Sequence, residues 1–227
     1  MPLLEIACFN AESALVAQEA GAGRVELCKE QELGGTTPLL STFKYLKHVL
    51  SIPVYVMIRP HGRDFFYGDE EFRVMEQDLE TFKREGAQGF VFGMLDEHGK
   101  VDQQRCRDLV SRAEGRPCTY HRAFDEIPEN EMEEQLEVLI ECGIRAVLTS
   151  GGKKNAVEGK ETLKRLVTAA NGKLDVIVGG GVRSSNVEML KSETSAKVFH
   201  SSAIVDNKRG EIASRDEIKQ LERLING

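Results

Sequence analysis

Short apolar segments rich in β-branched residues recur along the whole chain, and their starts lie 21 to 35 residues apart. Runs of about four to eight such residues, bounded by turn residues, are typical of buried strands. The chain contains eight of them, over Leu3–Cys8, Arg24–Cys28, Val54–Arg59, Gly89–Met94, Cys118–Ala123, Ala146–Thr149, Asp175–Val178 and Lys197–His200. This repetition constrains the fold more than any other feature of the sequence.

An amphipathic segment with helix start or stop signals follows each predicted strand. Asn10 is placed to cap a helix that closes at Gly21, and Thr37 is placed to cap the next, with Pro38 in its first turn. Further helices are expected over Asp69–Glu85, Asp102–Glu114, Glu129–Cys142, Gly159–Ala170, Ser185–Lys191 and Arg215–Leu224. The chain therefore consists of consecutive strand–helix units.

Eight such units in 227 residues average about 28 residues each, which is near the size of a (β/α)8 barrel, or TIM barrel. A doubly wound sheet is the alternative fold. It requires a G-x-G-x-x-G turn after the first strand, and no glycine occurs over Cys8–Glu12. No linker rich in Pro, Gly or Ser divides the chain. We expect a single α/β domain over residues 1–227, folded as one TIM barrel.

Composition excludes several classes of function. Thirty Lys and Arg against 37 Asp and Glu give a net charge of −7, which repels the phosphates of nucleic acids. No stretch approaches the roughly 20 apolar residues that cross a bilayer, and the first residues do not resemble a signal peptide. The five cysteines are an odd number without a C-x-x-C pair, which favours a reducing cytoplasm over a disulfide framework.

Polar residues at the strand ends are the candidates for catalysis, because a parallel barrel gathers its chemistry at the carboxyl ends of its strands. Side chains alternate along a strand, so His121 and Arg122 point in opposite directions. Asp125 has the same place in this alternation as His121, so the two side chains would point to the same side, which favours His121 inside the barrel. Arg122 then either binds an anion or pairs with a flanking helix, and Glu26 is either a catalytic base or a buried carboxylate paired with Arg59. The catalytic candidates are Glu26, Arg59, His121, Arg122, Asp125 and His200.

Three late loops are rich in Gly and Ser. After the last strands of a barrel, such loops often hold a phosphate through bare backbone N–H groups. Glycine is also required by many turns for positive φ, so the composition fits a purely structural role as well. The candidate anion-binding residues are Ser150, Gly151, Gly180, Gly181, Ser201 and Ser202. The aromatic segment His61–Gly68 is either a lid over this end or packing for the barrel core.

Two cysteines are candidate metal ligands. Cys8 and Cys28 end the first two predicted strands, which are neighbours in a barrel, and a near-linear pair of thiolates suits Cu(I). The alternative is that both are ordinary buried thiols. The sequence contains no H-E-x-x-H, C-x-x-C or His-x-His pattern of the kind that binds zinc. It also places no lysine on the inner face of a strand end, where a Schiff-base enzyme would carry one.

An ordered set of motifs resembles the CutC family, which is named for copper homeostasis. These motifs are Arg24–Cys28, Gly34–Pro38, Val56–Pro60 with Asp64–Phe65, Gly89–Gly93, Tyr120–Asp125, Leu148–Gly152, Gly179–Val182 and Phe199–Ala203. The resemblance implies a TIM barrel of the cytoplasm that forms a homo-oligomer. It also implies Cu(I) binding by cysteines near the ends of the first two strands, here Cys28 and Cys8.

Three hypotheses of function follow from the sequence. In the first, the chain is a cytoplasmic copper homeostasis protein that binds Cu(I) through Cys28 and Cys8. In the second, it is an enzyme that acts on a small anionic or phosphorylated metabolite, with Glu26 or His121 as base and the glycine-rich loops as phosphate site. In the third, the polar residues at the strand ends form a saturated ion network without an open pocket.

Overall fold

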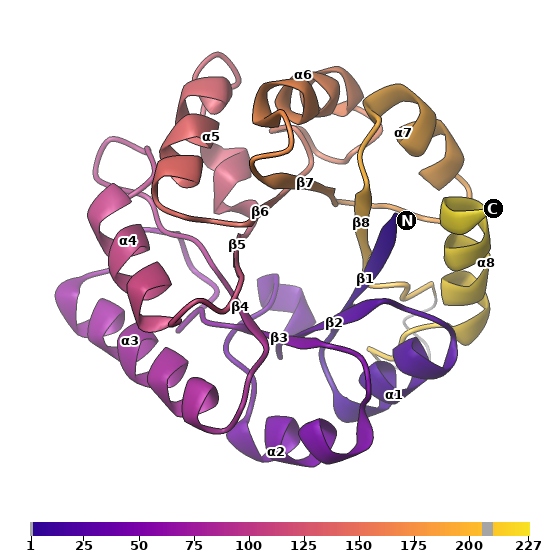
Figure 1. Cartoon of the computed structure of the whole chain (residues 1–227), viewed down its shortest axis with the longest axis horizontal. Coiled ribbons are helices and arrows are strands. Elements are labelled where there is room, and N and C mark those ends of the chain that lie inside the picture. Colours follow the sequence, from indigo (N-terminus) through magenta and orange to yellow (C-terminus); the bar gives the residue numbers. More distant parts are fainter. Residues whose placement is uncertain (1, 206–210) are drawn as a thin grey trace.

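Eight parallel strands close into a barrel in the computed structural model, which describes residues 2–205 and 211–227 (Figure 1). Each strand pairs with the next along the chain, and the last pairs with the first. The strands are β1 Leu3–Cys8, β2 Arg24–Leu27, β3 Val54–Met57, β4 Gly89–Phe92, β5 Cys118–Tyr120, β6 Ala146–Thr149, β7 Asp175–Val178 and β8 Val198–Ser201. The prediction of a (β/α)8 barrel is confirmed.

The helices form an outer ring around the strands (Figure 1). They are α1 Ala11–Glu19, α2 Leu40–Val49, α3 Asp69–Arg84, α4 Gln103–Arg112, α5 Met132–Glu141, α6 Lys160–Ala170, α7 Val187–Thr194 and α8 Arg215–Asn226. Two short 3₁₀ helices, η1 (Gln31–Leu33) and η2 (Arg122–Glu126), follow β2 and β5. Asn10 caps α1 as expected, since its side chain accepts from the Ser13 N–H at 2.8 Å.

The expected cap at Thr37 is wrong. Helix α2 begins at Leu40, and no side chain caps it. The Thr37 hydroxyl instead accepts from the Arg59 N–H at 2.9 Å and bonds to the Arg59 carbonyl oxygen at 3.1 Å. These bonds attach the loop after β2 to the chain that leaves β3, and they hold the backbone of Arg59 in place.

The interior of the barrel divides into apolar and polar parts. Alternate residues of each strand face outward and pack against the helices, as Leu4, Ile6 and Cys8 of β1 do. Inside, one apolar cluster contains Leu3, Ala146, Leu148, Ile177 and Val198, and a second contains Cys28, Met57 and Val91. Charged side chains of β1, β2 and β8 occupy the remaining interior. Among the described residues, no helix is long and apolar enough to cross a bilayer.

Candidate functional site

A cavity of about 390 Å³ lies at the carboxyl ends of the strands. All six catalytic candidates border it, and so do four of the six candidate anion-binding residues. The catalytic candidates are Glu26, Arg59, His121, Arg122, Asp125 and His200, and the anion-binding ones are Gly180, Gly181, Ser201 and Ser202. The third hypothesis from the sequence required a saturated network without an open pocket, and this cavity argues against it.

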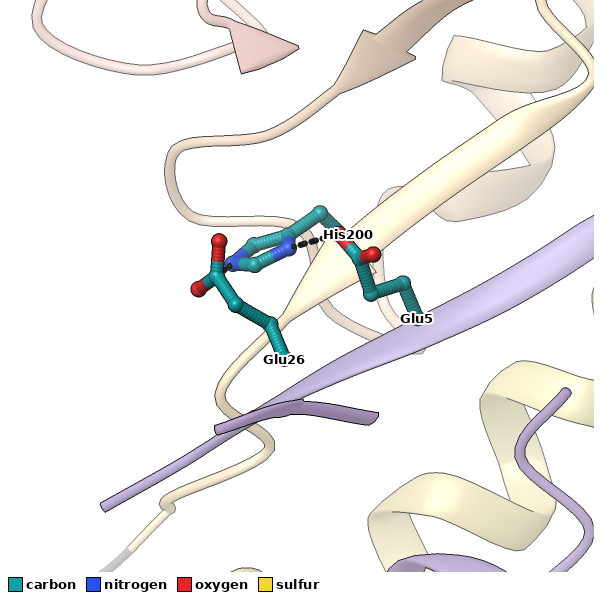
Figure 2. A group of neighbouring side chains, drawn as sticks. All are labelled: Glu5, Glu26 and His200. Atoms are coloured by element: carbon teal, nitrogen blue, oxygen red, sulfur yellow. Dashed lines mark hydrogen bonds and ion pairs between the residues drawn. The ribbon is translucent and has the colours of Figure 1, made fainter. Parts of the chain in front are cut away.

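Glu5, His200 and Glu26 form a line of side chains across the inner wall of the barrel (Figure 2). The register pairs Glu5 with His200 on β8, which brings Glu5 Oε1 within 2.7 Å of His200 Nδ1. On the other side of the imidazole, Nε2 lies 3.9 Å from Glu26 Oε2, too far for a direct hydrogen bond. The other oxygen of Glu26, Oε1, is buried and bonds to none of the described residues.

The two carboxylates have opposite protonation behaviour. Burial acts to raise the pKa of Glu5, but the charge of Arg24 and the contacts with His200 outweigh it and hold the pKa at about 2. Burial dominates at Glu26, where it raises the pKa to about 7. Burial opposes the charge of His200, yet the nearby Glu26 and Glu5 raise its pKa. Near neutral pH, Glu5 is therefore ionised, whereas the pKa of Glu26 lies close to the ambient pH.

Glu5 and Arg24 are site residues that the sequence analysis missed. The Arg24 Nε donates to Glu5 Oε2 at 2.5 Å, and its guanidinium lies over the ring of Tyr55. Neither charge lies at the carboxyl end of its strand, since Glu5 is inside β1 and Arg24 is the first residue of β2. The signal in the sequence was a lone glutamate in the apolar run of β1, at a position whose parity places it inside the barrel.

Arg59 does not pair with Glu26, contrary to one of the expected alternatives. Its Nη1 donates to the carbonyl oxygens of Leu33 and Gly35 at 2.7 and 2.9 Å, and the guanidinium lies over the Phe65 ring. The side chain has turned away from the strands toward the η1 loop, where these carbonyls are available. Arg59 is buried, and its Nε has no partner among the described residues.

His121 lies inside the barrel, and its hydrogen bonds define its tautomer. The Nδ1 accepts from the Ala123 N–H at 3.2 Å, so the hydrogen of the neutral ring resides on Nε2. Burial and the charge of Arg59 lower the pKa of His121 to about 3. The ring is therefore neutral, with its N–H on Nε2, and the residue borders the cavity. This arrangement suits a hydrogen-bond donor better than the catalytic base considered in the sequence analysis.

Arg122 and Asp125 belong to a separate network. Arg122, in η2, borders the cavity beside Gly180, and its Nε donates to Asp125 Oδ2 at 2.7 Å. The Asp125 carboxylate also accepts from the Ser150 N–H at 3.0 Å and the Gly152 N–H at 3.1 Å. The Gly151 N–H donates to the Thr149 hydroxyl at 2.8 Å. Asp125 thus occupies the β6 loop as an internal anion. Ser150 and Gly151 are not among the residues that border the cavity, and their binding of an external anion stays a prediction.

The loops after β7 and β8 remain open to an anion. Gly180 and Gly181 both have positive φ, and their N–H groups donate to none of the described residues. Ser202 borders the cavity beside them. Ser201 differs, because its hydroxyl donates to the Val182 carbonyl oxygen at 2.8 Å and accepts from Arg183 and Ala203. It therefore joins the two loops rather than facing a ligand.

Arg183 adds a cation to this side of the cavity, although it was not among the candidates chosen from the sequence. Its guanidinium donates to the carbonyl oxygens of Val182 and Ile204, at 2.8 and 3.1 Å. No carboxylate of residues 2–205 or 211–227 lies within ion-pair distance of Arg183 or of Arg59. The cavity thus contains two fixed positive charges that no described acidic residue neutralises.

Cys8 and Cys28 do not form a two-thiolate site. Cys8 is opposite Leu27 in the register and packs with it in the layer between strands and helices, whereas Cys28 belongs to the inner cluster. Burial, followed by the charge of Glu26, raises the pKa of both thiols well above the ordinary range. Thiolates are the form that binds copper. The expected linear Cu(I) pair therefore does not fit the geometry.

Comparison with known proteins identifies similar chains. The model of the CutC family matches residues 2–205. A mouse protein named "Copper homeostasis protein cutC homolog" is 41% identical over 201 residues, which cover 88% of this chain and 73% of the relative. A CutC family protein of Histophilus somni is 44% identical over 211 residues, covering 90% of this chain and 86% of the relative.

Solved structures agree with these relatives. A crystal structure of a CutC protein from Streptococcus agalactiae is 32% identical, covers 89% of this chain and 99% of its own, and superposes with a TM-score of 0.85. N-(5'-phosphoribosyl)anthranilate isomerase from Pyrococcus furiosus is only 15% identical, with a TM-score of 0.65 over 99% of this chain and 98% of its own. The second likeness concerns the barrel fold alone.

Proposed function

The chain belongs to the CutC family, and from the geometry of its barrel we propose that it is an enzyme that transfers protons on a small anionic metabolite. The observation that carries the proposal is the Glu26–His200 pair, whose facing atoms lie 3.9 Å apart beside the cavity. Glu26 has a pKa of about 7, near the value that makes a carboxylate an effective acid or base at neutral pH. Glu5 and Arg24 support this pair from the barrel interior.

The pair is suited to moving a proton next to a carbonyl group. Ionised Glu26 would take a proton from the carbon, while the Nε2–H of the His200 imidazolium donates to the carbonyl oxygen. The product is an enol, with Glu26 protonated and His200 neutral. Reversal returns the proton of Glu26 to the carbon and the enol proton to His200. Glu5 keeps its hydrogen bond to Nδ1 throughout, which directs Nε2 toward the substrate.

An anionic substrate is supported by the opposite side of the cavity. Arg183 is fixed by backbone carbonyls, and the N–H groups of Gly180 and Gly181 have no partner among the described residues. Ser202 adds a hydroxyl. Bare N–H groups beside a cation in a loop after β7 are the usual elements of a phosphate site. We assign the phosphate of the substrate to these residues.

Hydrogen exchange with solvent tests the proton transfer without knowledge of the product. The purified protein would be incubated in D2O with a mixture of small phosphorylated and carboxylated carbonyl compounds, and the mixture examined by mass spectrometry. We expect at least one compound to gain deuterium at carbon in the presence of the protein. Glu26→Gln should slow that exchange at least about a hundredfold, because it removes the group that accepts the proton.

Two controls make the exchange experiment specific. Glu70→Gln changes an exposed carboxylate in the first turn of α3, outside the cavity lining, and should retain the exchange rate. His200→Asn should lose it, with the fold verified by circular dichroism. If no compound exchanges, or if Glu26→Gln exchanges as fast as the parent, the proposal is wrong.

Cu(I) binding is the second candidate function, supported by the names of the relatives and by one contact. Cys28 packs with Met57 in the inner cluster, and a thiol beside a thioether is a soft donor set. Competition titration with a Cu(I) chelator would compare the parent with Cys28→Ser, Met57→Leu and Cys8→Ser. We expect the first two changes to weaken Cu(I) binding and the third to leave it unchanged. Equal binding by all four proteins contradicts a cysteine site.

The location and assembly of the protein belong to the same proposal. All five cysteines are free, as a reducing cytoplasm would maintain them. The homo-oligomer implied by the family resemblance remains a prediction, which sedimentation of the purified protein would test.

A further inference from the structure

We propose that the cavity contains a second anion subsite, formed by Arg59 and His121, and that the substrate therefore carries a carboxylate in addition to its phosphate. This inference rests on the proposed function and specifies its substrate class. It assigns His121 the role of a binding residue. The phosphate side is formed by residues that follow β7 and β8, whereas Arg59 and His121 follow β3 and β5 across the ring (Figure 1).

Two hydrogen-bond donors carry the argument. Arg59 is 5% exposed and His121 is 4% exposed, and both border the cavity. The Arg59 Nε and the His121 Nε2 are buried and have no partner among the described residues. A buried donor without an acceptor costs about 1–3 kcal/mol, so two such donors on residues that line one cavity favour a ligand that supplies acceptor oxygens.

The positions of both donors are fixed by neighbouring groups. Two backbone carbonyls hold the Arg59 guanidinium, and the Ala123 N–H holds the imidazole of His121. The Phe65 ring packs against both, 4.8 Å from the guanidinium carbon of Arg59 and 5.1 Å from the centre of the imidazole. A ligand would meet these groups already ordered, which reduces the entropy lost on binding.

The charge of the subsite favours a carboxylate over a second phosphate. Arg59 contributes one positive charge that no described acidic residue neutralises. His121 is neutral and contributes a hydrogen-bond donor only. A single charge with two N–H donors matches a monoanion with two acceptor oxygens, whereas a phosphate dianion would keep an unbalanced charge in a buried place. The phosphate thus belongs on the Arg183 side, with the bare N–H groups of Gly180 and Gly181 and the Ser202 hydroxyl.

Three probes separate the two subsites. 3-Phosphoglycerate carries both groups, glycerol 3-phosphate lacks the carboxylate, and glycerate lacks the phosphate. Isothermal titration calorimetry with the full chain would measure each affinity. We expect 3-phosphoglycerate to bind at least about tenfold more tightly than glycerol 3-phosphate, because its carboxylate adds one charge-assisted contact.

His121→Asn tests the role of His121 while retaining its local structure. The shorter amide can still accept from the Ala123 N–H, as Nδ1 does, but it has no donor at the position of Nε2. We expect this variant to weaken the affinity for 3-phosphoglycerate about tenfold. Its affinity for glycerol 3-phosphate should stay within about twofold of the parent value. His98→Asn, at an exposed histidine, is the matched control and should change neither affinity. Melting curves would verify that both variants are folded.

The possible results distinguish this inference from the proposed function. If glycerol 3-phosphate binds as tightly as 3-phosphoglycerate, or if His121→Asn weakens both equally, the carboxylate subsite is wrong and the phosphate site stands. If glycerate binds in a manner that depends on His121 while glycerol 3-phosphate does not bind, the carboxylate subsite stands and the phosphate assignment fails. Binding of none of the three probes overturns both.

Discussion

At the scale of single residues, the protonation of Glu26 is the property on which the proposed chemistry depends. Its carboxyl group is buried beside His200, and the pKa of about 7 shows that the folded protein disfavours the ionised form. Glu5, on the other side of the His200 ring, remains ionised because Arg24 and His200 both bond to its carboxylate. Two chemically identical groups thus acquire different roles from their neighbours.

Glu26→Gln should therefore change stability in a pH-dependent way. Because the folded pKa exceeds the ordinary 4.5, the parent loses stability as pH rises from about 5 through 7, and the amide does not titrate. We expect similar stability at pH 4.5 and a variant more stable by about 3 kcal/mol at pH 8. Urea denaturation at the two pH values measures this. A variant less stable than the parent at pH 8 contradicts the raised pKa.

A second prediction concerns Gly93, which provides space for His121. A methyl group at residue 93 would lie 2.4 Å from His121 Nδ1 and 3.1 Å from the Cβ of Ala123. We expect Gly93→Ala to displace the imidazole, to lower the free energy of unfolding by about 1–3 kcal/mol, and to weaken the binding of 3-phosphoglycerate. Thermal melting and calorimetry measure both effects. Gly68→Ala, whose added Cβ would lie at an ordinary contact distance of 3.7 Å from Glu71 Oε2, is the control, and equal effects of the two changes would contradict this role of Gly93.

At the scale of elements, the 3₁₀ helix η2 and the loop after β6 form one unit around Asp125. The carboxylate accepts hydrogen bonds from Thr149 Oγ1 at 2.5 Å and from the N–H groups of Ser150 and Gly152. η2 begins directly after His121, so this unit also fixes the chain that carries the imidazole. These bonds give Asp125 a structural role at the site, and a catalytic role for it stays a prediction.

Asp125→Asn should loosen this unit. The amide nitrogen of asparagine would face N–H donors, so at least one buried hydrogen bond is lost and one donor is left without an acceptor. We expect a loss of about 2–4 kcal/mol in the free energy of unfolding, measured by urea denaturation. The neighbouring Glu126→Gln should cost less than about 0.5 kcal/mol. If the two variants are equally stable, the network around Asp125 does not contribute to stability.

The elements themselves were predictable because strands and helices have different hydrophobic periods, and the eight expected strands occur with boundaries shifted by a few residues. Residue parity also predicted His121 inside the barrel. Parity alone could not give the register between strands, in which Cys8 faces Leu27 and therefore points away from Cys28. Nor could it give side-chain rotamers, which direct Arg59 to carbonyls of the η1 loop and Asp125 to the β6 loop.

At the scale of the whole molecule, closure of the barrel joins the first strand to the last strand. β1 pairs with both β2 and β8, and α8 packs against β1 and α1 (Figure 1). Ile218, Leu221 and Ile225 of α8 are buried against this seam. The site lies beside the same seam, because Glu5 and His200 come from the first and last strands.

Leu221→Ala should therefore destabilise the entire barrel. Removing a fully buried leucine side chain costs about 2–5 kcal/mol, and the closed ring should transmit the loss to every strand. We expect a lower midpoint of urea unfolding with a single transition, the same by circular dichroism and by tyrosine fluorescence. Lys219→Ala, on the exposed side of α8, should leave the midpoint unchanged. Separate transitions for the two signals would show that the seam opens independently.

The pairing of β1 with β8 also has a consequence for synthesis of the protein. Translation delivers Glu5 and Glu26 well before His200, so a nascent chain that has not yet reached β8 has neither the imidazole nor the wall that encloses it. Fragments that end before β8 cannot form the Glu26–His200 pair, however many strands they contain. The proposed activity would then appear only once β8 has been made and has paired with β1, which makes the first turnover a sign of a closed barrel.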